Sequence, residues 1–180
     1  MGCLAVLFAL NEQEVENLLA VERSERADYM HEEIEENFWN EFPEYVCELD
    51  KSWDAMHRVL TDGTLNFENE FQPLCNVIFG GEFVYGLTRQ SSGEVIIIES
   101  EEDEFMILKT PEQVAEIAEE LPKKTKEECR KCYDMIDPED YDGWLDEEDF
   151  EYTWEYLQDS LDFWKKAAEE KRYVLFTVDR

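Results

Sequence analysis

Basic residues are scarce in this sequence, which has 16 lysines and arginines, 47 aspartates and glutamates, and two histidines. The formal net charge is therefore -31 at pH 7. A field of this sign repels the phosphate backbone of nucleic acids and the anionic surface of membranes, so we expect neither as a partner. A basic protein is the natural complement of such a surface, although the same charge can serve solubility alone.

Long apolar runs and a regular cysteine framework are also missing. No run approaches the roughly 18 apolar residues that suggest a membrane-spanning helix. The apolar start, Cys3–Leu10, has no basic residues before it and no small-residue cleavage site after it, so it does not match a signal peptide. Five cysteines without regular spacing argue against a secreted disulfide scaffold. We therefore expect a cytoplasmic protein.

Sequence motifs for nucleotide binding and nucleophilic catalysis are absent, since the chain has no G-x-S-x-G, P-loop or G-x-G-x-x-G. A C-x-x-C is formed by Cys129 and Cys132. It falls inside an expected helix that follows another helix, whereas the reactive thiols of thioredoxin-like sites follow a strand. A zinc site needs two further ligands. We favour a structural role for this pair over a redox or zinc site.

A partial calcium-loop pattern occurs at Asp140–Gly143 with Asp149. If Gly143 occupies the sixth position of an EF-hand loop, the first position is Pro138, which offers no side-chain ligand. The twelfth position is then Asp149, where a bidentate glutamate is expected. We therefore predict no dedicated metal site and no cofactor.

Apolar patterning predicts one α+β domain over residues 1–180. Aromatic residues make up 13% of the chain, whereas disordered acidic chains contain few. Strands and helices occur in runs, which is typical of a small mixed sheet packed by several helices, and the apolar first and last strands could pair. Capping boxes are predicted at Asn11, Thr110 and Thr125. The expected strands are Cys3–Leu10, Leu74–Phe79, Val95–Glu99, Phe105–Leu108 and Tyr173–Val178, and the strand at Val95–Glu99 could form a hairpin with the one at Phe105–Leu108. The expected helices follow Asn11 and cover residues 24–40, 50–61, 110–121, 125–135 and, as a long amphipathic helix, 146–170.

One candidate pocket emerges from residues with functional side chains or unusual backbone freedom. His57 follows Trp53 by one helical turn, and both lie on the apolar face of an expected helix. Gly80 and Gly81 allow close backbone approach after an expected strand, and Glu82 follows them. A pocket that combines these residues could bind a small ligand, whereas the simpler alternative is a histidine held within the core. No residue is assigned a catalytic role.

Several segments together resemble the YfbM-like family of bacterial proteins of unknown function. The matching segments are Leu49-Asp50-Lys51-Ser52-Trp53 with His57 and Leu60, Val77-Ile78-Phe79-Gly80-Gly81-Glu82, Thr110-Pro111-Glu112-Gln113-Val114, and the last helix and strand. The chain departs from the family at Val95–Leu108, where an acidic and aliphatic stretch replaces a Gly/Tyr-rich one. The resemblance implies a bacterial, cytosolic α+β domain and brings no activity with it.

Composition and motifs together rank three functional classes. The first is a non-catalytic protein-binding domain, for example an acidic immunity-type protein that docks on a basic partner. The alternative is a small-ligand-binding protein or enzyme that uses the region of Trp53, His57 and Gly80-Gly81. The third is a housekeeping protein whose charge provides only solubility.

Overall fold

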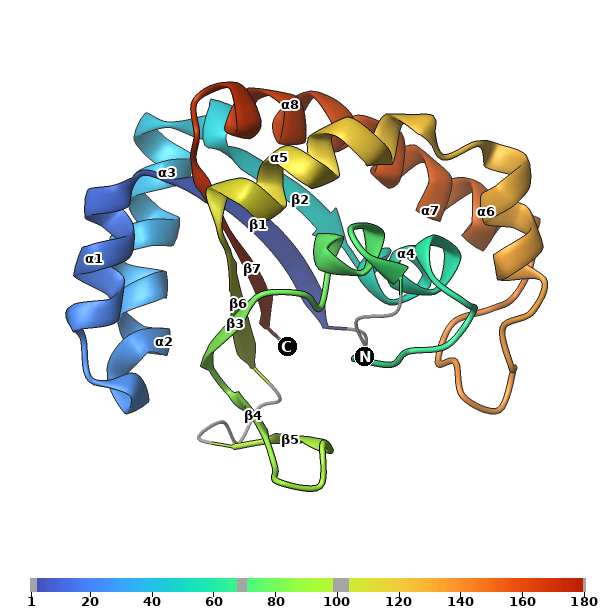
Figure 1. Ribbon diagram of the computed structural model, residues 1–180, viewed down its shortest axis with the longest axis horizontal. Coiled ribbons are helices and arrows are strands. Elements are labelled where there is room, and N and C mark those ends of the chain that lie inside the picture. Colours follow the sequence, from blue (N-terminus) through green and yellow to red (C-terminus); the bar gives the residue numbers. More distant parts are fainter. Residues whose placement is uncertain (1–2, 68–70, 99–103, 180) are drawn as a thin grey trace.

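The computed structural model describes residues 3–67, 71–98 and 104–179, and its centre is an antiparallel sheet of five strands. The strand order is β2-β1-β7-β6-β3 (Figure 1). As predicted, the first and last strands pair, from Leu4 opposite Asp179 to Leu10 opposite Tyr173. The sheet strands are β1 (Leu4–Leu10), β2 (Val46–Asp50), β3 (Glu82–Tyr85), β6 (Phe105–Lys109) and β7 (Tyr173–Asp179). A separate pair consists of β4 (Leu87–Arg89) and β5 (Val95–Ile97).

Helices cover both faces of the sheet (Figure 1). One face carries α1 (Glu12–Ala20), α2 (Arg26–Tyr29), a π-helical stretch (Met30–Glu35) and α3 (Glu36–Glu41). The other carries α4 (Trp53–Leu60), α5 (Pro111–Glu120), α6 (Lys126–Tyr133), α7 (Glu147–Asp159) and α8 (Leu161–Glu169). The α+β fold class is therefore confirmed. Within the described ranges, no helix is long and apolar enough to cross a membrane.

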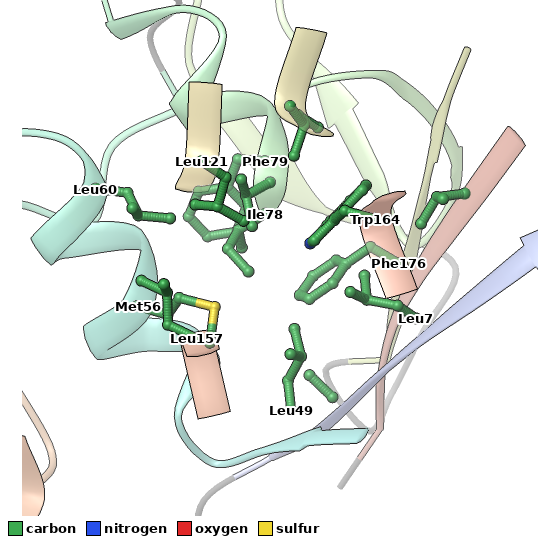
Figure 2. Close-up of a cluster of buried hydrophobic side chains, with 14 of the residues drawn as sticks. Leu7, Leu49, Met56, Leu60, Ile78, Phe79, Leu121, Leu157, Trp164 and Phe176 are labelled. Carbon is green, nitrogen blue, oxygen red and sulfur yellow. The ribbon is translucent and has the colours of Figure 1, made fainter. Parts of the chain in front are cut away.

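Two buried clusters, one on each side of the sheet, explain why its strands are apolar at almost every position. Along β1, Leu7 belongs to the cluster on the α4–α8 side, whereas Phe8 and Leu10 belong to the cluster beneath α1–α3. Figure 2 shows part of the larger cluster, where side chains of the sheet and of α4 surround a common interior that also receives Trp164 of α8. An antiparallel sheet with one wet face would alternate apolar and polar residues instead.

The three predicted capping boxes are present. Asn11 accepts a hydrogen bond from the backbone of Glu14 at 2.9 Å, and the Glu14 carboxylate accepts one from the backbone of Asn11 at 2.7 Å. The same reciprocal pairs start α5 at Thr110 and α6 at Thr125. Each box satisfies backbone N–H groups that a helix start leaves without a partner.

Two helix boundaries differ from prediction. The helix expected from Asp50 begins instead at Trp53, because Asp50 ends β2 with a φ of 49°. The long helix expected over 146–170 is divided at Ser160 into α7 and α8. Ser160 is fully buried, and its hydroxyl donates to the carbonyl of Leu157 at 2.7 Å. Such a bond competes with the backbone hydrogen bonds of a continuous helix.

Two strand predictions were also wrong. The segment expected as a strand over Leu74–Phe79 contains a 3-10 helix (Leu74–Val77), because its backbone is satisfied locally, for example by the Asn76 N–H on the Pro73 carbonyl at 3.0 Å. The expected hairpin of Val95–Glu99 with Phe105–Leu108 does not form among the described residues, since β5 pairs with β4 and β6 lies between β3 and β7. The acidic residues 99–103 lie outside the described ranges.

Candidate functional site

His57 and Trp53, the two residues of the predicted pocket that carry rings, occupy different environments. His57 is fully buried, and its Nε2 donates to the carbonyl of Asn66 at 2.8 Å. Burial lowers the pKa of His57 to about 4, so the ring is neutral at pH 7. Trp53 is half-buried, and its Nε1 donates to the carbonyl of Cys3 at 3.0 Å. The Phe79 ring contacts both, with centroids 4.6 Å from His57 and 6.1 Å from Trp53.

The predicted glycines, Gly80 and Gly81, directly follow Phe79 in the chain. Gly80 is buried, and its carbonyl accepts a hydrogen bond from Lys109 at 2.9 Å. Gly81 is exposed with a φ of +129°, and a Cβ there would lie 2.4 Å from the carbonyl oxygen of Leu108. This close approach of the Leu108 backbone explains why position 81 is a glycine. Glu82 is exposed at the start of β3. The structure places Trp53 at a wide groove and Gly81 at a separate cavity, whereas His57 lines neither.

The wide groove has a volume of about 1050 Å³ and is formed by α4, the α6–α7 connection and the first turns of α7. Its lining combines aromatic rings with carboxylates, and Lys51 is the basic residue among them. The aromatic residues are Trp53, Tyr141, Trp144 and Tyr152, and the acidic residues are Asp54, Asp142, Asp146, Glu148 and Asp149. We refer to this site as the acidic-aromatic groove.

Arg58 lies beneath the acidic-aromatic groove and contacts residues that line it. Its side chain is 1% exposed. It donates from Nε to the Asp54 carboxylate at 2.6 Å and from Nη2 to the backbone carbonyl of Asp140 at 2.7 Å. Burial opposes the charge of Arg58, but the hydrogen bonds and ion pairs with Asp54 and Asp140 together outweigh burial, so the pKa of Arg58 is raised. The guanidinium also lies 5.5 Å from the centroid of Tyr141, which ties the α6–α7 connection to α4.

Asp149 fixes the opposite wall. Its Oδ2 accepts hydrogen bonds from the hydroxyls of Tyr133 at 2.7 Å and Tyr141 at 2.9 Å. Burial and the Asp149 carboxylate raise the pKa of both tyrosines well above their usual range, so both stay protonated donors. Gly143 allows the chain to pass close to Tyr141, since a Cβ there would lie 2.4 Å from that ring. The groove is therefore preformed by internal contacts.

Other side chains in the groove remain open to solvent. Trp144 is 85% exposed, and Asp142 and Glu148, which line the same groove, are also exposed. An aromatic face next to carboxylates attracts ammonium or guanidinium groups through both cation–π and Coulomb interactions. Among the residues that the structure covers, no group of three or more His, Cys, Asp or Glu side chains is arranged to hold a metal ion.

The C-x-x-C lies in α6, and Cys129 and Cys132 are not joined by a disulfide. Burial raises the pKa of Cys129 to about 12, which disfavours the reactive thiolate. Cys132 is half-buried, with its sulfur 3.6 Å from the carbonyl oxygen of Thr61. These contacts give both residues packing roles between α6 and α4.

Sequence reasoning missed Arg58 and the groove that it supports. The signal for the Arg58–Asp54 pair is their spacing of four residues, which places them on one face of a helix. The aromatic and acidic residues of 141–152 are evident in the sequence, but nothing in their spacing shows that they face α4. Only the fold brings these two segments together.

Comparison with known proteins agrees with this fold. The chain matches the family described as "Domain of unknown function (DUF1877)" over residues 1–177. Its structure is similar to the crystal structure of YfbM, a protein of unknown function from Escherichia coli, with a TM-score of 0.63, 16% sequence identity, and coverage of 97% of this chain and 99% of YfbM. No curated protein sequence matches. The predicted resemblance to YfbM is thus confirmed, and the chain belongs to the DUF1877 family, for which no function is established.

Proposed function

We propose that this protein is a non-catalytic, cytoplasmic binding domain whose acidic-aromatic groove receives a lysine- or arginine-rich segment of a partner protein. The observation that carries the proposal is the pairing of the 85% exposed Trp144 with exposed carboxylates in a groove of about 1050 Å³. An immunity-type protein that neutralises a basic toxin is one instance of this class. The net charge of -31 would attract such a partner from a distance.

Arginine suits the groove better than lysine. A guanidinium can stack on an indole such as that of Trp144 while it donates two hydrogen bonds to one carboxylate, which an ammonium cannot do. A cation over an exposed aromatic face contributes about 0.5–1 kcal/mol, and more when water is excluded. The floor is held by Arg58 and the wall by Asp149, so little ordering of the groove is required when a partner binds.

The internal bonding of the groove favours binding over acid–base chemistry. Asp149 is occupied by two tyrosine hydroxyls, and Asp54 is paired with Arg58. Asp142 and Glu148 are exposed carboxylates. Exposed carboxylates of this kind set association rate and specificity in charged complexes.

Fluorescence anisotropy with a labelled oligoarginine peptide tests the proposal. The double substitution Asp142→Asn with Glu148→Gln removes two groove charges, and we expect about tenfold weaker binding. A matched control, Glu16→Gln with Glu116→Gln, removes two exposed charges from α1 and α5 and should change affinity by less than about twofold. Equal weakening by both pairs would show that net charge alone attracts the peptide, which would contradict the proposal.

The alternative function is a small-ligand-binding protein or enzyme in the region of Trp53, His57 and Gly80-Gly81. The observation that favours it is the cavity lined by Gly81. His57 would enter such a function only through Phe79, which contacts His57 and lines that cavity. If this alternative holds, substitution of His57 or Trp53 by Ala should weaken ligand binding more than it lowers the free energy of unfolding. Urea titration of each variant measures the change in the free energy of unfolding.

A further inference from the structure

A second, smaller cavity of about 270 Å³ lies beside β3 and the start of α5, and it shares no lining residue with the acidic-aromatic groove. In a chain with 47 acidic residues, its described lining contains no carboxylate, and its charged group is Arg89. The lining residues are Gln72, Asn76, Phe79, Gly81, Phe83, Arg89 and Gln113. The Arg89 guanidinium therefore offers a negatively charged ligand a local attraction on a generally acidic molecule.

The guanidinium of Arg89 is held in place before any ligand arrives. Nη1 donates to the carbonyl of Gly93 at 2.8 Å, and Nη2 donates to the carbonyl of Phe67 at 3.2 Å. The group lies 6.0 Å from the centroid of the Phe83 ring. A guanidinium has five N–H donors, so these two bonds leave donors for a ligand at a fixed position.

Gln113 adds a polar group from α5 to the cavity lining. Its Oε1 accepts the backbone N–H of Thr110 at 3.0 Å in the capping box, so the oxygen is occupied and the amide nitrogen remains as the donor end. Gln113 lies in the first turn of α5, where the helix dipole is positive. Arg89 and Gln113 thus present donors, and a ligand must present acceptors.

The backbone of the cavity wall is fixed by Lys109. This fully buried side chain donates to the carbonyls of Ile78 at 2.8 Å and Gly80 at 2.9 Å, on either side of Phe79. Phe67 stacks on Phe79 with centroids 4.0 Å apart. The aromatic part of the wall is consequently rigid, as a preformed ligand site requires.

We propose that this cavity binds a small carboxylate that carries one planar ring, with the carboxylate on Arg89 and Gln113 and the ring against Phe83. The size agrees, because a cavity of about 150 Å³ already accommodates benzene, whereas a dinucleotide needs far more space. The cavity gives the protein a second binding function that is independent of the basic-segment groove.

Isothermal calorimetry with benzoate and its neutral isostere benzamide tests the assignment. We expect benzoate to bind at least about tenfold more tightly than benzamide, because only benzoate offers a charged acceptor to Arg89. The substitution Gln113→Glu is the decisive variant. Glutamate also completes a capping box, so the fold is retained while a carboxylate enters the cavity, and benzoate binding should fall by about tenfold or more.

Two further variants complete the test. Arg89→Gln should abolish the preference for benzoate, whereas Lys131→Gln, which removes an exposed positive charge from α6, should leave it unchanged within about twofold. The assignment is overturned if neither probe binds at millimolar concentration, if benzamide binds as well as benzoate, or if Gln113→Glu binds benzoate normally. None of these outcomes depends on the acidic-aromatic groove.

Discussion

At the scale of single residues, His57 and Lys109 are fully buried bases whose pKa values burial lowers. Each donates to backbone carbonyls, His57 to Asn66 and Lys109 to Ile78 and Gly80. Burial lowers both pKa values, to about 4 for His57 and about 7 for Lys109. The pH dependence of stability should therefore carry a separate signature from each.

His57 should destabilise the fold as the pH falls. The unfolded chain binds a proton below a pKa of about 6.5, whereas the folded chain binds it only below about 4. Between these values the unfolded state holds more protons, so stability is lost on acidification. We expect the wild type to lose about 2–3 kcal/mol relative to His57→Gln between pH 7 and pH 4, measured by urea unfolding. Parallel pH profiles of the two proteins would contradict this.

Lys109 should act in the alkaline range. Its pKa is about 7 in the folded state and about 10.4 in the unfolded chain. The unfolded state therefore holds more protons between these values, and stability should increase with pH across this window. Relative to Lys109→Met, the wild type should gain roughly 4 kcal/mol between pH 7 and pH 10. The same urea titrations measure it, and a pH-independent difference between the two proteins would disprove the low pKa.

At the scale of elements, α4 depends on the pairing of Arg58 with Asp54. Removal of one member of a buried ion pair leaves the other charge unpaired and costs about 3–5 kcal/mol. We expect this loss for Arg58→Met, and partial recovery in the double variant Arg58→Met with Asp54→Asn. Asp54 lines the groove, so the double variant should fold but bind the oligoarginine probe more weakly. Additive losses in a double-mutant cycle would show that the pair is not coupled.

The elements that were predicted correctly are those that depend on residues close together in the chain. The capping boxes at Asn11, Thr110 and Thr125 are correct because each depends on residues three apart in the chain. Pairing of strands depends on distant residues, so the partners of Val95–Ile97 could not be read from its own apolar character. The 3-10 helix at Leu74–Val77 has the composition of a strand and satisfies its backbone locally, which composition does not show.

The candidate site was predictable only in part for the same reason. Trp53 lines the acidic-aromatic groove and Gly81 lines the smaller cavity, and these two surfaces share no lining residue. Phe79 contacts Trp53 and lines the smaller cavity. His57 shares the apolar face with Trp53 in sequence, yet it is 0% exposed. The segment 141–152 meets α4 only because α6 and α7 pack on the same side of the sheet, which no pattern in either segment specifies.

At the scale of the whole molecule, the acidic residues behind the net charge of -31 are not distributed evenly between its concave surfaces. Carboxylates line a groove together with exposed aromatic rings, whereas a smaller cavity elsewhere has none among its described lining residues. The two faces of the sheet also differ, since α1–α3 cover one and the groove is built on the helices that cover the other (Figure 1). The proposed site for a cationic partner is thus one place on a generally acidic surface.

The five tryptophans provide the most direct test of that assignment. In a nitrogen–proton correlation spectrum, each indole N–H gives a separate signal. Trp144 is 85% exposed in the groove, Trp39 is 40% exposed on α3 across the sheet, and Trp164 is fully buried. Titration with an oligoarginine peptide should shift the Trp144 signal most and leave those of Trp39 and Trp164 unchanged. Shifts that are as large at Trp39 as at Trp144 would contradict a dedicated groove.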